Sequence, residues 1–234
     1  MSEWGPKRFW QKAEVVPEGE QFAIALDGRP VRTLSRRHLV VPTNAMAAQI
    51  AAEWDAQGER VDPTTMPWTR SANSALDKVP DQRGEVEAHL KGYAETDLLL
   101  YRAEGPGELI RRQGAGWDPI LDWIAVNYGV RLATTQGIMP VQQDPDHIGR
   151  LAGIMAAMNH FQLIGFHDLV STSGSYILAV AVAENQVDAA AGWAHSRIDE
   201  DWQIEQWGVD EEAAEQATLK KAAFFHAAEF LRCA

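Results

Sequence analysis

The sequence predicts an α+β fold, in which a small β-containing part precedes a larger helical part. Near the N-terminus, apolar residues alternate with period two at Phe22, Ile24 and Leu26, which is typical of a half-buried strand. Farther along the chain they recur every three or four residues, which is typical of amphipathic helices. Because strands and helices form separate blocks, the pattern favours an α+β fold, or two domains, over a parallel α/β sheet.

A hairpin signal supports the β part. Residues 21–26 form the expected strand, and Asp27-Gly28 follows it directly. This pair is typical of a two-residue turn, because glycine tolerates the positive φ that such turns require. Further short strands are expected over residues 9–16, 29–34 and 39–41.

Helices are predicted from apolar periodicity and from residues that favour helix ends. Thr43 is a suitable N-cap, and Asp followed by Pro is a typical helix start, because proline lacks the N–H that the first turn leaves unpaired. Residues 176–183 could form a buried strand, but their alanine content favours a buried helix. The expected helices cover residues 43–57, 69–79 and 82–101, one from Asp118-Pro119, one from Asp144-Pro145 to Ile164, and two over 187–207 and 210–231.

This order of elements predicts two domains, an N-terminal β-hairpin and helix domain over residues 1–79 and a helical domain over 80–234. With 234 residues, of which 46% are hydrophobic, the chain can bury a core without a disulfide or a metal. Cys233 is the one cysteine, which is typical of a reducing compartment, and we expect no catalytic role for it. The longest apolar run is too short to span a membrane, so no membrane span is expected.

The net charge of −12 is unevenly distributed. Up to Ala45 the chain carries a net charge of +2, so the remainder carries −14. Eight acidic residues and no Lys or Arg lie between Asp199 and Glu215. Because such a field repels phosphate backbones, we expect no nucleic-acid partner. The acidic stretch is either a solvated face or a rim that meets a basic partner.

Motif searches favour binding over catalysis. The chain has no phosphate-binding loop and no Gly-x-Ser-x-Gly elbow. His160, His167 and Asp168 are candidate metal ligands on two helices expected to meet at a Gly165 turn, but their spacing matches no common zinc site. We therefore assign no catalytic residue, metal, cofactor or small-molecule substrate. Because carboxylates are abundant, a hydrolase-type enzyme using carboxylate or histidine chemistry is the alternative.

The predicted helix over residues 187–207 carries large apolar groups on two sides. One side carries Trp193, Glu200, Ile204 and Trp207, and the opposite side carries Ile198 and Trp202. Such a helix is buried on both sides, or it is buried on one and offers the other to a partner. Glu200 either pairs within the chain, for example with Arg197, or contacts a basic residue of that partner.

Trp54 raises a similar question in the first helix. Together with Met46 and Ile50 it recurs every four residues, so it either anchors this helix to the body of the protein or contacts a partner. We favour anchoring. Deleting a buried tryptophan costs about 3–5 kcal/mol, which is comparable to the whole stability of a domain.

Several blocks of the sequence, in order, resemble one known family. They are residues 7–10, 26–33, 53–54, 93–102, 112–113, 117–119 and 196–208. On these blocks the chain, from Lys7 to Leu231, is identified as a member of the ATP synthase assembly chaperones that act on the alpha subunit. The resemblance implies a small N-terminal β-containing domain and a helical C-terminal domain. It also implies a protein that is not an enzyme.

The resemblance further implies the partner and the site. A chaperone of this kind binds the unassembled alpha subunit, prevents its aggregation and hands it over to the beta subunit without hydrolysing ATP. The acidic cluster of the family corresponds to Asp199, Glu200 and Asp201, and its functional tryptophan to Trp54. The helical wheel favours Glu200 as the acting carboxylate, and the alignment also allows Asp199. The predicted partner-binding residues are therefore these four together with Trp193, Ile204 and Trp207.

Localisation is also an expectation from the resemblance. Mitochondrial members carry a presequence, and this chain begins without one, so we expect a bacterial, cytoplasmic member of the family. A scaffold subunit that stays in the finished complex is a further alternative.

Overall fold

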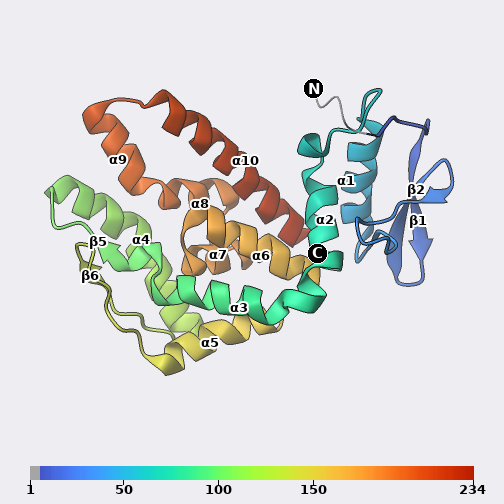
Figure 1. Ribbon diagram of the computed structural model, residues 1–234. Coiled ribbons are helices and arrows are strands. Elements are labelled where there is room, and N and C mark those ends of the chain that lie inside the picture. Colours follow the sequence, from blue (N-terminus) through green and yellow to red (C-terminus); the bar gives the residue numbers. More distant parts are fainter. Residues whose placement is uncertain (1–5) are drawn as a thin grey trace. The chain divides into compact units, whose positions relative to one another are not determined.

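The computed structural model describes residues 6–234, which form two compact units. The first unit contains the chain up to Arg83 together with residues 159–165 and 229–234. The second contains residues 84–158 and 166–228. A β-sheet lies in the first unit, and the second is almost entirely helical (Figure 1), so the predicted α+β fold is confirmed. The expected boundary after residue 79 stays a prediction.

The sheet of the first unit is built on the predicted hairpin. β1 (Ala13–Glu18) and β2 (Gln21–Leu26) pair antiparallel. Asp27 and Gly28 then both have positive φ, as the turn requires. The return strand is shorter than predicted, because residues 32–37 fold into a turn of their own after β3 (Arg29–Pro30). β4 (Val40–Val41) also pairs with β2.

Two helices complete the first unit. α1 (Asn44–Asp55) packs on the sheet, and Thr43 caps it as predicted, its Oγ1 accepting a hydrogen bond from Met46 N at 3.3 Å. α2 (Pro67–Asp77) packs on α1 after the short helix η1 (Pro63–Thr65). The fully buried core includes Ile24, Leu39, Val41, Met46, Ile50, Ala72 and Phe230.

The second unit is organised around α7 (Tyr176–Ala183). Residues 176–182 are all buried, and α4 and α8 pack against this helix (Figure 1), so the predicted buried helix is confirmed. The other elements after α2 are α3 (Val79–Glu95), η2 (Leu98–Leu100), β5 (Tyr101–Arg102), α4 (Gly107–Tyr128), β6 (Thr135–Gln136), α5 (Pro145–Ala156), α6 (His160–Ser173), α8 (Ala189–Ser196), α9 (Ile198–Trp207) and α10 (Glu211–Arg232).

Two predicted helix ends in this region are wrong. α3 ends at Glu95 and not at Tyr101, because Asp97 caps η2 instead of continuing the helix. The Asp118-Pro119 pair lies inside α4 and does not begin it. The helix-forming residues 108–113 and the burial of Trp117, which directly precedes the pair, outweigh the start signal.

The single helix predicted from Asp144 to Ile164 is two helices. Asn159 and Gln162 exchange two hydrogen bonds of 2.9 Å between backbone N–H and side-chain oxygen, a capping box that begins α6 anew. The turn expected at Gly165 is also wrong, since Gly165 lies within α6. A Cβ there would lie 3.1 Å from Leu231 Cα, so the glycine serves a close approach of two helices.

The helix predicted over residues 187–207 is also two helices. α8 begins after Asp188, whose carboxylate accepts a hydrogen bond from Ala191 N at 2.7 Å. The chain then breaks at Arg197, with φ −108 and ψ 3, before α9 begins. The helical wheel that placed Trp193 in line with Ile204 therefore does not hold across this break.

The close approach at Gly165 is testable by substitution. We expect Gly165→Ala to lower the free energy of unfolding by about 1–3 kcal/mol, because the added methyl group meets backbone atoms of Leu231 that cannot rotate away. Urea denaturation followed by circular dichroism measures this change. Gly149→Ala in α5 is the matched control, since open space surrounds that position, and it should gain about 0.5–1 kcal/mol. Equal effects at the two sites would contradict the close-approach argument.

Candidate functional site

An open groove of about 660 Å³ lies in the second unit. Helix α9 forms one wall, and the beginning of α4 with the segments after β5 and β6 forms the other. Its apolar lining combines aromatic and aliphatic side chains with a few polar groups, which is typical of a binding surface. The lining residues used below are Pro106, Leu109, Gln113, Ile138, Asp199, Trp202 and Trp207.

Helix α9 is unusual because none of its residues is buried. Trp207 is 79% exposed and Ile204 is 37% exposed. The connector that follows exposes Val209 as well. These three exposed apolar side chains lie close together in the sequence and beside the groove, and such a grouping favours contact with another molecule.

Arg112 of α4 holds α9 in place. Its guanidinium lies 4.9 Å from the centre of the Trp202 ring, and its Nη1 lies 2.7 and 2.8 Å from the two carboxylate oxygens of Glu205. Its Nε also donates to Glu108 at 3.3 Å. One arginine thus joins α4 to α9 by charge and by ring stacking, without burying the helix.

Asp199 lies at the start of α9 and lines the groove. Its Oδ1 accepts a hydrogen bond from Gln113 Nε2 at 2.7 Å, and Gln113 Oε1 accepts one from Ala103 N at 2.8 Å. No Lys, Arg or His side chain of residues 6–234 forms an ion pair with Asp199, since Arg102 pairs with Asp118 and Arg112 with Glu108 and Glu205. The groove therefore contains a half-buried carboxylate that is hydrogen-bonded to Gln113 and forms no ion pair with the described residues.

The other two predicted carboxylates lie differently. Glu200 is not among the groove residues, and its side chain, 48% exposed, pairs with Arg197 at 3.1 Å. This is the pairing within the chain that the sequence left open. Asp201 is exposed. Because Trp193 is buried against Phe224, with ring centres 5.8 Å apart, it belongs to the core.

Of the predicted site residues, the structure thus brings Asp199 and Trp207 together in the groove. Glu200 and Ile204 lie on the same helix outside its lining. Groove residues that the sequence reasoning missed come from α4 and the β5 and β6 segments, although the blocks of the resemblance contain Tyr101, Arg102 and Gln113. That all the predicted residues contact a partner stays a prediction.

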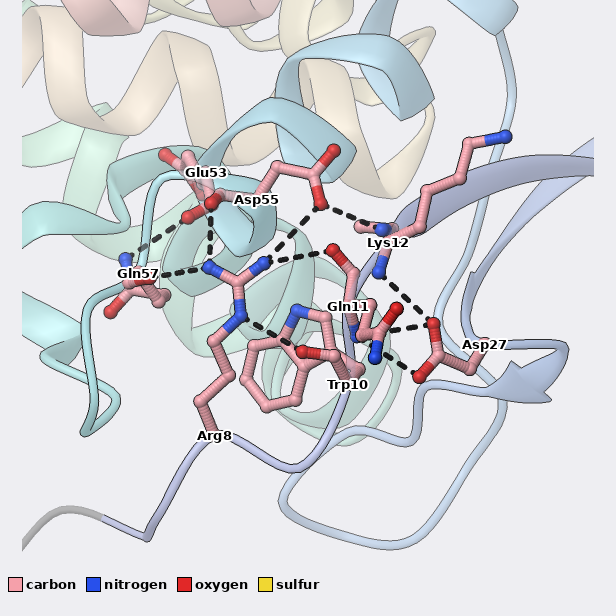
Figure 2. A network of polar contacts seen from close by, with 9 residues as sticks. Arg8, Trp10, Gln11, Lys12, Asp27, Glu53, Asp55 and Gln57 are labelled. Atoms are coloured by element: carbon pink, nitrogen blue, oxygen red, sulfur yellow. Dashed lines mark hydrogen bonds and ion pairs between the residues drawn. The ribbon is translucent and has the colours of Figure 1, made fainter.

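Trp54 lies in the first unit, half-buried against its core. Its ring meets that of Trp10 edge to face at 5.3 Å. Arg8 fixes the segment that carries Trp10, donating from Nε to Trp10 O at 3.0 Å and from Nη1 to the carbonyls of Asp55 and Gln57 at 2.8 and 2.6 Å (Figure 2). These contacts support the role of Trp54 as an anchor of α1.

Glu53, the neighbour of Trp54, caps α2. Its carboxylate accepts hydrogen bonds from Trp68 N at 2.6 Å and Thr69 N at 2.8 Å. Burial raises the pKa of this carboxyl. Together, the Glu53-Trp54 pair ties the end of α1 to the start of α2.

The structure does not place the candidate metal ligands His160, His167 and Asp168 as the sequence suggested. His160 and His167 lie on one continuous helix, α6, and not on two helices around a turn. His167 Nδ1 lies 3.0 Å from Asp168 Oδ1, a local contact between neighbours. Within residues 6–234, no three His, Cys, Asp or Glu side chains lie close enough to hold a metal ion.

Asp97 is a structural residue that the sequence reasoning did not identify. It is fully buried and accepts hydrogen bonds from Leu99 N at 2.9 Å, Ser175 Oγ at 2.7 Å and Ile177 N at 2.9 Å. It therefore joins η2 to the start of α7. Burial without a cation raises its pKa to about 6.

Comparison with known proteins identifies the family. The model of the ATP12 chaperone protein family matches residues 7–125, about half of the chain. The chain belongs to this family. This is a family of chaperones and not of enzymes, so the hydrolase alternative is set aside, and the protein is an assembly chaperone for ATP synthase.

Solved structures agree with this membership. The chain is 44% identical to Atp12 from Paracoccus denitrificans, covering 99% of both chains with a TM-score of 0.94. It is 37% identical to a chaperone candidate from Agrobacterium tumefaciens, covering 97% of this chain and 86% of the other with a TM-score of 0.91. It is also 26% identical to the mitochondrial protein atp12 of Schizosaccharomyces pombe, over 89% of this chain and 76% of that protein. ATP12 relatives thus occur in bacteria and in mitochondria.

None of the helices in residues 6–234 is long and apolar enough to cross a membrane.

The buried Asp97 predicts a dependence of stability on pH. Its pKa of about 6 in the folded state exceeds the ordinary 3.8, so the folded protein binds more protons between these values. The contribution of this group to stability is therefore full below pH 4 and falls as the pH rises to about 6, by roughly 3 kcal/mol. We expect Asp97→Asn to remove this fall, which urea unfolding measured from pH 4 to 7 would show as a flatter profile.

At pH 7 the same variant should still be less stable than wild type. The new amide group would place an N–H opposite Ile177 N–H or Leu99 N–H, and a mismatched buried pair costs about 1–3 kcal/mol. Parallel pH profiles for the two proteins would show that Asp97 does not titrate in this range.

Proposed function

We propose that this ATP12 protein holds the unassembled alpha subunit of ATP synthase and covers a surface that the beta subunit later occupies. The observation that carries the proposal is helix α9, which presents Trp207 and Ile204 to solvent beside an apolar groove and buries none of its own residues. A chain that leaves such a surface open while burying a full core elsewhere is suited to bind another protein.

The chemistry of the groove supports a basic, apolar contact on the client. Asp199 lies in the groove and forms no ion pair with the described residues, since Arg102, which also lines the groove, pairs with Asp118. In the sequence, the eight acids between residues 199 and 215 have no basic residue among them. A lysine or arginine of the client would neutralise Asp199, while its apolar neighbours would cover Trp202 and Trp207. The acids set the orientation and the rate of encounter, and the tryptophans supply most of the affinity.

Holding of this kind needs no nucleotide. A free alpha subunit exposes an interface meant for a neighbour, and exposed interfaces of obligate complexes aggregate. Binding lowers the concentration of that free state by mass action. The beta subunit then displaces the chaperone when it binds the same surface more tightly. In a bacterium this exchange would take place in the cytoplasm, where the subunits are made.

Co-expression tests the proposed function. The alpha subunit is produced alone and together with this chain, and the soluble fraction is examined by gel filtration. We expect more soluble alpha subunit and a complex of the two proteins that forms without added nucleotide. Addition of beta subunit should release the chaperone. If alpha remains insoluble and no complex elutes, the proposal is wrong. A chaperone that stays in the assembled synthase would instead be a scaffold subunit.

Variants in the groove locate the contact. We expect Trp207→Ser to weaken binding of the alpha subunit by tenfold or more, on the order of an interface hot spot, without lowering the melting temperature, because the side chain is exposed. Val126→Ser, at a side chain 80% exposed on α4, is the matched control and should bind like wild type. Wild-type affinity of the Trp207→Ser protein would place the contact elsewhere.

A charge test separates Asp199 from Glu200. Asp199→Asn should weaken binding mainly at low salt, since screening removes the charge contribution. Glu200→Gln should change binding less, because that carboxylate already pairs with Arg197. The reverse order would support the helical-wheel expectation for Glu200. Binding constants at two salt concentrations decide between the two acids.

A further inference from the structure

The first unit carries an ordered loop that the groove hypothesis does not use. Residues 32–37, here called the 32–37 loop, turn back on themselves, and Thr33 N donates to Arg37 O at 2.9 Å. Asp77 of α2 holds the loop, accepting hydrogen bonds from Thr33 Oγ1 at 2.8 Å and Ser35 N at 2.9 Å. The side chain of Arg37 also donates to Leu76 O at 2.6 Å. The loop is therefore fixed at several points.

This loop holds an apolar side chain in solvent. Leu34 is 90% exposed, although Val31 and Thr33 on the other face are buried. The turn is completed by Arg36, whose φ of +64 lies in the left-handed region. That conformation costs a residue other than glycine on the order of 1 kcal/mol. The chain thus has an arginine at a position where glycine would cost less conformational energy. This indicates that the arginine side chain has a function.

Positive charge surrounds the exposed leucine. Arg29, Arg32 and Arg36 are exposed, and within residues 6–234 no carboxylate forms an ion pair with any of them. Arg32 Nη1 donates to Arg36 O at 2.8 Å, so these two arginines belong to the same turn. His38, opposite Arg32 in a bridge, lies 3.6 Å from Glu18, and the carboxylate of Asp77 is engaged by Thr33 and Ser35. The loop is a basic surface on an acidic protein.

We propose that the 32–37 loop is a second contact with the client, which recognises an acidic surface with an apolar recess for Leu34. This inference rests on the proposed function, since the client is the same alpha subunit held at the groove. Arginines that form no ion pair within the described residues complement carboxylates of the client, and a leucine held out by an ordered backbone enters a recess with little loss of entropy. The contact has the opposite polarity to the groove, so it selects a different part of the client surface.

The observations favour a protein partner over a lipid surface or a nucleic acid. One leucine and three arginines are a small anchor, since membrane attraction is worth only about 1 kcal/mol per basic residue near an anionic surface. The net charge of −12 also opposes an anionic bilayer and a phosphate backbone. A protein surface with a few carboxylates presents no such extended field.

Exchange into a client complex tests the loop. The complex of the wild-type chain with the alpha subunit, obtained by co-expression, is mixed with labelled free chain, and the label taken up is measured. We expect Leu34→Ser to exchange in on the order of tenfold less well than labelled wild type. Arg36→Gly should be about threefold weaker at low salt and close to wild type at high salt. Because glycine relieves the left-handed strain, Arg36→Gly should keep or raise the melting temperature.

Controls are matched for each change. Val126→Ser removes an equally exposed apolar side chain from α4, and Asn185→Gly relieves the left-handed φ of 56 at another site. Both should exchange like wild type. If the two loop variants also exchange like wild type, the second contact is wrong while the groove stands. If the wild-type chain forms no complex at all, both proposals fall. Binding of wild type, but not Leu34→Ser, to anionic vesicles would replace the protein partner with a membrane.

Discussion

The position of α9 depends on Arg112. None of the residues of this helix is fully buried, so its apolar packing is limited to half-buried side chains such as Ile198, which lies against Gly116 of α4. Directed contacts at its edge add to this packing. Arg112 supplies them through Glu205 and the face of Trp202, and Gln113 beside it adds the hydrogen bond to Asp199. Two adjacent residues of α4 therefore hold a helix whose outer surface stays open. A fully packed α9 would be more stable and would have nothing to offer a client.

The blocks that identify the family divide into two kinds of residue. Some are internal supports: Asp97 joins η2 to α7, Glu53 caps α2, and Arg8 binds carbonyls at the end of α1. Others line the open groove with only part of their hydrogen-bonding capacity used, such as Asp199, which accepts one hydrogen bond from Gln113. Burial and internal partners separate the two kinds, because a carboxylate that already accepts three hydrogen bonds has little left for a client.

The sequence predicted the kinds of element better than their ends. The β1–β2 hairpin and the buried α7 followed from local patterns, because period-two alternation and an alanine-rich apolar run each reflect one environment. Helix breaks were missed where a specific bond decides them. The Asn159–Gln162 capping box and the turn at Arg197 interrupt stretches that remain periodic, so periodicity alone does not reveal them. The turn predicted at Gly165 was wrong for a related reason. Only the close contact with Leu231, which is distant in the sequence, shows that this glycine serves helix packing and not a turn.

Only one wall of the groove could be predicted from the sequence, because the other wall depends on contacts between distant segments. The stretch around α9 was recognisable from its tryptophans and acids, but its opposite wall comes from segments some sixty to a hundred positions earlier in the chain. The break at Arg197 also changes which side chains share a face. Trp193 turns into the core against Phe224, and Asp199, not Glu200, turns to the groove. A wheel drawn through a continuous helix cannot anticipate either change.

Charge resolves a conflict that any holding chaperone faces. A surface apolar enough to cover an unfinished interface would also attract a second copy of itself. Around Trp207 and Val209, acids of the stretch from 199 to 215 outside the ion pairs of Glu200 and Glu205 repel an identical surface, because two copies would bring like charges together at short range. The same acids attract a client that carries basic groups. Charge therefore prevents self-association, and the tryptophans supply affinity for the client. Both are needed for a surface that binds the client and not a second copy of the chaperone.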